Sequence, residues 1–241
     1  IDTLKQRYQN IKTIPTKVLT FGASVQDFEL LTEISILPSI NFNLDTINIV
    51  YAGRGGQDLR DSVTLVLKAF KMCIERDAAY LKCHFWFIGT SYAPDGEGKK
   101  TIESIAEDLA IGSYVTEITD RKPYFEVLSL LKQSDLMFIP GSSDTNYTPS
   151  KLYPYILAKK PLLCVFHSKS NIVEVIKPLN AGEVVLFDTE NALEDCYHSL
   201  SKLLAAIPYV PNTNWEQFQP FTAEQMTKAQ CDFFDTVISN S

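Results

Sequence analysis

Glycines and arginines suited to phosphate binding follow the apolar run Ile47–Ala52. The segment Gly53-Arg54-Gly55-Gly56 comes directly after that run, and Arg60 lies four residues further on. Glycines let the backbone approach a phosphate closely, and an arginine fork pairs with phosphate oxygens. The third glycine of a dinucleotide fingerprint is missing, and no Gly-Lys-Ser/Thr follows, which disfavours an NAD site and excludes a Walker loop. The alternative interpretation is a tight turn with solvated arginines.

A second candidate anion site lies at residues 144–151. Thr148 is a good N-cap residue and Pro149 suits the first position of a helix, so we expect a helix to begin here. The free N–H groups of that turn, together with Ser150 and Lys151, would attract an anion. The alternative is an ordinary capped helix with an exposed lysine.

Two further loops carry weaker signals. Thr119-Asp120-Arg121-Lys122 follows an apolar run and could contact a nucleobase edge through its backbone, although a solvated turn explains it equally simply. Residues 167–171 read as a loop and a helix cap at Ser170 or Asn171. No Ser–His–Asp order, His-Glu-x-x-His motif or pair of catalytic carboxylates is present, so the catalytic residues stay unknown. Any chemistry here would be anion binding and orientation.

Short apolar runs and helical stretches alternate along the chain and predict the elements that hold these loops. The runs are nearly continuous in apolar residues, which is typical of strands in a parallel sheet with helices on both faces. Between them, Val63, Val66, Leu67 and Phe70 lie on one face of a helix. The fold class is therefore α/β, a Rossmann-like doubly wound parallel sheet of about six strands. The predicted strands are Ile47–Ala52, Cys83–Ile88, Tyr114–Ile118, Leu136–Ile139, Leu162–Phe166 and Glu183–Phe187.

The flanks differ from this central region. Residues 1–45 read as a connector with a helical start and one short strand candidate, Lys17–Phe21. Residues 46–207 form the Rossmann-like domain, and residues 208–241 a helical extension with a helix at about 222–238. In an open α/β sheet, ligands bind beyond the carboxyl ends of the strands, where the candidate loops lie.

The composition narrows the class of protein. The 241 residues carry a net charge of −7, which disfavours nucleic acid and anionic membranes as partners. No apolar run approaches the roughly 20 residues of a membrane span. Five cysteines without a Cys-x-x-Cys pair make a disulfide scaffold or a metal site improbable. We expect a cytoplasmic protein that can lie against the inner face of a membrane.

Several segments match a known pattern in the same order along the chain. They are "KVLTFGASVQDF" at 17–28, "YAGRGGQDLRDSVTLVLKAF" at 51–70, "HFWFIGT" at 84–90, "LSLLKQSDLMFIPGSS" at 128–143, "YTPSKLYPYILAKKPLLCV" at 147–165 and "NAGEVVLF" at 180–187. In this order they resemble the connector and the C-terminal, donor-binding half of GT-B glycosyltransferases of the large retaining class called family four. The segment at 147–165 is the most specific match.

The resemblance implies a site for a nucleoside-diphosphate sugar, a hexosyltransferase activity that retains configuration, and a glycan or lipid-linked acceptor. The acceptor would be bound by a further domain preceding Ile1, in the assembly of a surface polysaccharide. No metal or other cofactor is expected. The implied phosphate contacts are Gly53, Arg54, Gly55, Gly56, Arg60, Thr148, Ser150 and Lys151, and the implied base or ribose contacts are Gly89, Thr119, Arg121, Asp144 and Tyr153.

One feature departs from the family pattern. Two glutamates eight positions apart are usual, and the alignment places Asn146 and Pro154 there. Proline inside that helix would also remove an N–H group and kink the chain. Either Asp144 or Tyr153 holds the ribose instead, or donor binding is weakened or lost. This departure supports the alternative of a non-catalytic nucleotide-binding or scaffold module. Two further alternatives are a GT-B-like nucleotide-sugar epimerase or phosphorylase half and an unrelated flavodoxin-like domain.

Overall fold

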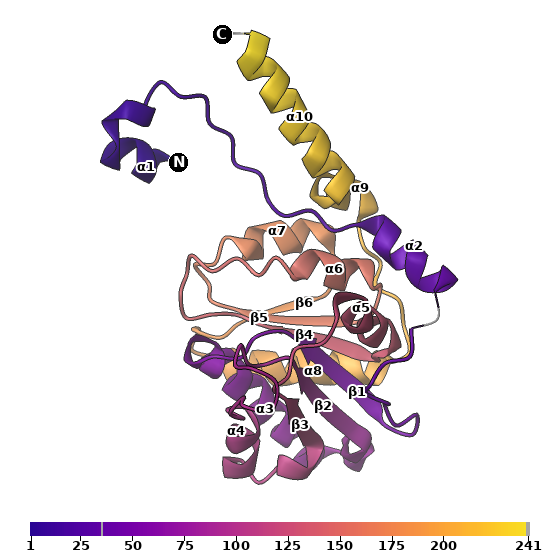
Figure 1. Ribbon diagram of the computed structural model, residues 1–241. Helices are drawn as coiled ribbons and strands as arrows, with labels where there is room; N and C mark the ends of the chain where they lie inside the picture. The colour runs from indigo at the N-terminus through magenta and orange to yellow at the C-terminus, as the bar shows by residue number, and fades with distance from the viewer. Residues whose placement is uncertain (35, 240–241) are drawn as a thin grey trace.

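A six-stranded parallel sheet forms the centre of the computed structural model, which describes residues 1–34 and 36–239 (Figure 1). The strand order is β3-β2-β1-β4-β5-β6, and every paired neighbour is parallel. This confirms the predicted fold class, and each strand end lies within one residue of its prediction. The strands are β1 (Ile47–Ala52), β2 (Cys83–Ile88), β3 (Val115–Ile118), β4 (Leu136–Pro140), β5 (Leu162–Phe166) and β6 (Glu183–Leu186).

Helices cover both faces of the sheet, with α3, α4 and α8 on one side and α5, α6 and α7 on the other (Figure 1). Alternate residues of β1 therefore face different cores: Ile49 and Tyr51 pack with α3 and α8, and Val50 packs with α5 and α6. Burial on both faces explains why the strands read as continuous apolar runs. The α-helices are α1 (Asp2–Arg7), α2 (Val25–Glu33), α3 (Arg60–Arg76), α4 (Glu103–Asp108), α5 (Tyr124–Gln133), α6 (Leu152–Leu157), α7 (Ile172–Leu179), α8 (Ala192–Ala206), α9 (Trp215–Phe218) and α10 (Ala223–Ser239).

The start of α3 is tied to the loop after β4. Asp61 and Ser62 are residue types that often cap a helix, but α3 begins at Arg60 without a side-chain cap. Ser62 is instead buried inside the first turn. Its Oγ lies 2.7 Å from the carbonyl oxygen of Gly141 and 2.9 Å from that of Leu59. The hydroxyl therefore fixes the start of α3 relative to the loop after β4.

The two flanks lie together on the side of the sheet that carries α6 and α7 (Figure 1). The strand predicted at Lys17–Phe21 is wrong, because this extended segment joins no ladder among the described residues, and Phe21 is 79% exposed. The bridge forms further on, between Ala23 and Thr222. The helix expected at 222–238 is α10, which buries none of its residues. No helix in the described part of the chain is both long and apolar enough to span a membrane.

Candidate anion site at the carboxyl edge of the sheet

A cavity of about 690 Å³ lies at the carboxyl ends of β1 and β2. Its walls come from the loops after β1, β2, β3 and β4, from α5 and α6, and from residues 21–27 of the N-terminal flank. The chain adds β2 and β3 on one side of β1 and then places β4, β5 and β6 on the other side. The order of the strands therefore reverses between β1 and β4. Ligands of open α/β sheets commonly bind at such a switch point.

Lys151 is the most unusual charge in this cavity. Its Nζ lies 2.7 Å from the hydroxyl oxygen of Tyr51 and 4.4 Å from the centre of that ring. No carboxylate among the described residues pairs with it. Burial, reinforced by the charges of Arg54 and Arg121, lowers the pKa of Lys151 to about 7. The site is thus a poor place for a cation on its own and a good one for an anion that offsets the charge.

Arg54 stands beside Lys151 but is already neutralised. Its two terminal nitrogens donate to both carboxylate oxygens of Asp58, at 2.8 and 2.7 Å. This bidentate bond, helped by the hydroxyl of Ser142 at 2.7 Å, lowers the pKa of Asp58 to about 2. The guanidinium also lies 4.9 Å from the centre of the Tyr147 ring. Arg54 therefore connects the loop after β1 to the loop after β4.

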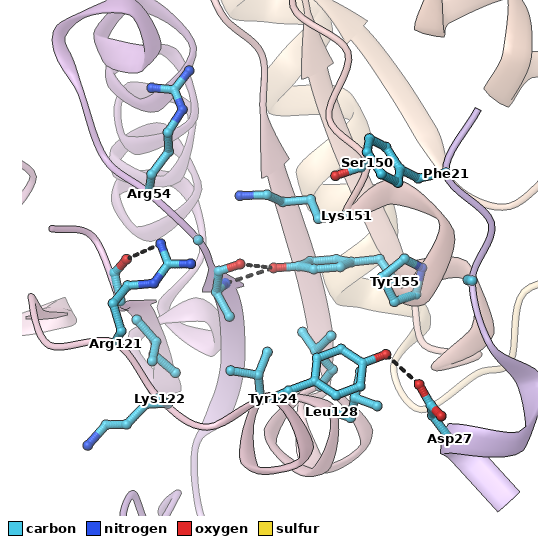
Figure 2. Close-up of a pocket in the computed structure, with 18 of the residues that line it drawn as sticks. Phe21, Asp27, Arg54, Arg121, Lys122, Tyr124, Leu128, Ser150, Lys151 and Tyr155 are labelled. Carbon is cyan, nitrogen blue, oxygen red and sulfur yellow. Dashed lines mark hydrogen bonds between the residues drawn. The ribbon is translucent and has the colours of Figure 1, made fainter. Parts of the chain in front are cut away.

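Arg121 supplies a second cation that no carboxylate of the described chain pairs with. Its Nη1 lies 3.5 Å from the carbonyl oxygen of Gly89, and its guanidinium lies 4.8 Å from the centre of the exposed Tyr92 ring. Figure 2 shows the Lys151 amino group directed toward the side of the cavity where Arg54 and Arg121 lie. Gly89 has φ +72°, a conformation that favours glycine, and this turn brings the backbone close to Arg121.

Gly53 makes room for the lysine. A Cβ atom built there would overlap Nζ of Lys151 and lie 2.8 Å from the hydroxyl oxygen of Tyr51. The structure thus shows a close approach of Lys151 to the Gly53 backbone, whereas the predicted approach to a phosphate stays a prediction.

The other end of the cavity is largely apolar. Val127, Leu128 and Leu131 of α5 line it. At its rim, the Tyr124 hydroxyl donates to Asp27 at 2.8 Å, which joins α5 to α2 (Figure 2). The cavity therefore has one cationic end and one apolar end, which suits a ligand with an anionic group and a flat or apolar group.

The start of α6 differs from its prediction. Thr148 does not cap this helix, which begins at Leu152 with Lys151 in the N-cap position. The Thr148 hydroxyl instead donates to Oδ1 of Asn171 at 3.1 Å. Asn171 is the N-cap residue of α7, but its side chain makes no capping hydrogen bond to that helix. Because α6 begins late, Pro154 lies in its first turn, where a backbone N–H has no partner within the helix. Pro154 therefore costs α6 no helical hydrogen bond, and the kink that we expected there has no cause.

The structure brings together only part of the residue set implied by the resemblance. Arg60 is exposed on α3 outside the cavity, and Tyr153 is 1% exposed and stacks on Phe221 in the core. Neither residue lines the cavity. The implied contacts that line the cavity are Gly53, Arg54, Gly89, Arg121, Thr148, Ser150 and Lys151, whereas Gly55, Gly56, Arg60, Thr119, Asp144 and Tyr153 lie outside its lining.

Sequence reasoning missed three polar residues at the site, Tyr51, Asp58 and Tyr155. Tyr51 and Tyr155 each lie in an apolar stretch, which gives no signal of a polar role. Asp58 follows Arg54 at the i+4 spacing of an ion pair, and that spacing was the available signal. The described residues contain no cluster of three or more His, Cys, Asp or Glu side chains that could hold a metal ion.

Comparisons with known proteins place the fold among glycosyltransferases. No family model and no curated protein matches the sequence. Among solved structures, sucrose-phosphate synthase from Thermosynechococcus elongatus matches all of this chain with a TM-score of 0.68 and 14% identity. WaaG, a glycosyltransferase involved in lipopolysaccharide biosynthesis, matches 95% of it with a TM-score of 0.59 and 16% identity. Anabaena HepE, solved in complex with UDP-glucose, matches 93% with a TM-score of 0.63 and 12% identity.

At 12–16% identity, these TM-scores show a shared fold and no more, the Rossmann-like α/β unit found in GT-B glycosyltransferases. The chain spans between 54% and 57% of the length of those three solved chains.

Proposed function

We propose that this chain is the donor-binding half of a glycosyltransferase and that its cavity holds the nucleoside diphosphate of a nucleotide sugar. The diphosphate would lie against Lys151 and Arg121, and the nucleoside would extend toward the apolar end. The finer assignments come from the family resemblance: retention of configuration, a hexose donor, and a glycan or lipid-linked acceptor bound by a second domain.

The observation that carries the proposal is the pair of cations without carboxylate partners. Lys151 and Arg121 come from loops on opposite sides of β1 and meet in one cavity at the carboxyl edge of the sheet. Burying the amine of Lys151 is costly unless an opposite charge compensates it, whereas Arg121 is exposed and adds a second positive charge. A doubly anionic group bound between them would provide that compensation, and the UDP-glucose complex of the structurally similar HepE makes a nucleotide sugar the natural candidate.

Such a site would act mainly on the leaving group. Negative charge builds on the diphosphate as the glycosidic bond breaks, so cations that contact it bind the transition state more tightly than the ground state. Because the pKa of Lys151 is lowered, protonation of its amine is coupled to diphosphate binding. A diphosphate that needs the charged amine would bind together with a proton above pH 7.

A second candidate, a nucleotide-binding module without transferase activity, is favoured by residues 146 and 154. Pro154 lies on the cavity wall and cannot accept a hydrogen bond from a ribose through its side chain. The exposed Asn146 donates through Nδ2 to its neighbour Asp144 at 3.2 Å. A donor could therefore bind through its phosphates while its ribose is held loosely.

The test is calorimetric titration with UDP, GDP, ADP, TDP and CMP, and then with the sugar conjugates of any that bind. EDTA is present throughout, because the proposal requires no metal ion. Lys151→Ala and Arg121→Ala should each weaken binding by about 1–3 kcal/mol, the range for a hydrogen bond to a charged group. Lys68→Ala, an exposed lysine on α3, is the matched control.

Three results would bear on the proposal differently. Absence of binding to every nucleotide, on a folded sample, would contradict it. Equal affinity in wild type and both cavity variants would show that the phosphates bind elsewhere. Binding of nucleotides with no discrimination for any sugar conjugate would favour the second candidate.

A further inference from the structure

The two central strands separate near the cavity, and a tyrosine hydroxyl fills the gap. β1 pairs with β2 along its whole length, up to Ala52 opposite Ile88. Its pairing with β4 is limited to Ile49 and Val50. Beyond that point, the backbone of Ala52 has no partner strand on the β4 side.

Tyr155 takes the place of the missing strand. Its hydroxyl oxygen accepts from the backbone N–H of Ala52 at 2.7 Å and donates to the carbonyl oxygen of Ala52 at 3.2 Å (Figure 2). One hydroxyl thus satisfies both polar groups of a residue at the end of a buried strand. Tyr155 is itself 1% exposed, so water does not replace these bonds.

The half-buried Lys151 lies at the start of the same helix, in its N-cap position. Lys151 precedes Tyr155 by four residues, and the N–H of Tyr155 donates to the carbonyl oxygen of Lys151 at 3.2 Å. The amine of Lys151 reaches the hydroxyl of Tyr51, which in turn donates to the carbonyl oxygen of Arg54 at 2.8 Å. One turn of α6 is therefore attached to two successive residues of β1, Tyr51 and Ala52.

We propose that Tyr155 is a positioning residue for the anion site: its hydroxyl holds β1 and β4 apart and fixes α6 so that Lys151 is kept inside the cavity. The inference concerns the placement of Lys151, and its connection to nucleotide binding rests on the proposed function. An amine flanked by Arg54 and Arg121 would otherwise turn toward water, where a lysine side chain is better solvated.

A neighbouring tyrosine provides a matched control. Tyr153 lies two residues away on α6 and is also 1% exposed, but its hydroxyl faces Thr20 of the N-terminal flank and makes no hydrogen bond to the described residues of β1. Tyr153→Phe and Tyr155→Phe therefore remove the same atom from the same helix. Only the second removes an attachment to β1.

The first measurement needs no ligand. Proteins labelled with ¹³C at lysine Cε are titrated by NMR, and the Lys151 signal is identified by its loss in Lys151→Met. In wild type and in Tyr153→Phe, Lys151 should titrate near pH 7. In Tyr155→Phe the midpoint should rise by about one unit or more as the amine leaves the two arginines and the buried site. An unchanged midpoint in Tyr155→Phe would overturn the inference.

The second measurement links the placement to binding. Pyrophosphate and UDP are titrated into the three proteins, and Tyr155→Phe should bind both at least about tenfold more weakly, whereas Tyr153→Phe should stay within about twofold of wild type. A role in stability alone would lower the melting temperature of Tyr155→Phe without changing either affinity, and that result would also overturn the inference. If wild type binds neither ligand, the proposed function fails, and the NMR titration still decides the inference.

A wild-type measurement covers the case in which Tyr155→Phe does not fold. Amide hydrogen exchange should find the N–H of Ala52 as protected as those in the β1–β2 ladder, although no strand faces it. Rapid exchange of this amide in the folded protein would show that the Tyr155 hydroxyl does not hold it, and the inference would be wrong.

Discussion

Replacing Lys151 with methionine tests the electrostatics of the cavity most directly. Lys151 titrates at about 7 in the folded protein and at about 10.5 in an unfolded chain. Between these values the unfolded chain holds the proton that the folded protein has released. The free energy of unfolding of wild type therefore gains up to about 1.4 kcal/mol per pH unit from this residue as the pH rises. Methionine keeps the length and apolar stem of the side chain but cannot titrate.

The expected magnitude is about 2 kcal/mol between pH 7 and pH 9, since Lys151 is still half protonated at the lower value. Urea unfolding of both proteins at pH 7, 8 and 9 measures the difference in their free energies of unfolding. Lys151→Met should be at its greatest advantage at pH 7 and lose about 2 kcal/mol of that advantage by pH 9. Groups common to both proteins cancel in the difference.

The same substitution at Lys68, an exposed lysine on α3, is the matched control for removing a surface lysine. A difference between Lys151→Met and wild type that is constant from pH 7 to pH 9 would refute the reasoning. It would mean that the Lys151 amine is solvated and that the cavity does not hold a buried charge.

Three further substitutions test the contacts around the cavity. Gly53→Ala should displace the Lys151 amine, because the added Cβ would overlap Nζ. Calorimetry should then find UDP binding about tenfold weaker, and an unchanged affinity would show that the lysine side chain adapts. Asp58→Asn should cost about 1 kcal/mol at pH 7 after allowance for solvent screening. That cost should fade as the pH falls from 3.8 towards 2, because Arg54 lowers the pKa of Asp58 in the folded protein. Urea unfolding of both proteins at a series of acidic pH values measures the cost. A cost that is undiminished at pH 2 would contradict the ion pair. Tyr155→Phe should lower the free energy of unfolding by about 1–3 kcal/mol, because it leaves the buried N–H and carbonyl groups of Ala52 unpaired. Tyr153→Phe should be neutral or stabilising by comparison. Equal losses of stability in thermal unfolding would argue against the Ala52 contacts.

The elements of the fold could be predicted because their causes are local. The run Leu162–Phe166 is apolar throughout because both faces of β5 are covered, and the spacing of Val63, Val66 and Phe70 already describes the buried face of α3. The order of strands and helices then restricts the fold, since parallel strands require crossover connections. The loops at the carboxyl ends of the strands, and with them Lys151, were located for the same reason.

The flanks were harder to predict because their partners are remote. Lys17–Phe21 has the composition of a strand, but only Ala23 meets a partner, and that partner is Thr222. Extended segments become strands when another strand is present to pair with them. A sequence pattern alone does not show whether that strand exists.

The sequence by itself determined the parallel sheet, the edge at which ligands bind and the residue types available there. Only the tertiary structure decided which of those residues are free to bind. Arg54 is occupied by Asp58, whose carboxylate is fixed by Ser142, 84 positions away. Lys151 is placed by tyrosines, one of them bonded to Ala52 across 103 positions of the chain. Hydrogen bonds of this kind depend on where packed elements meet, and the periodicity of a sequence records only which face of each element is buried.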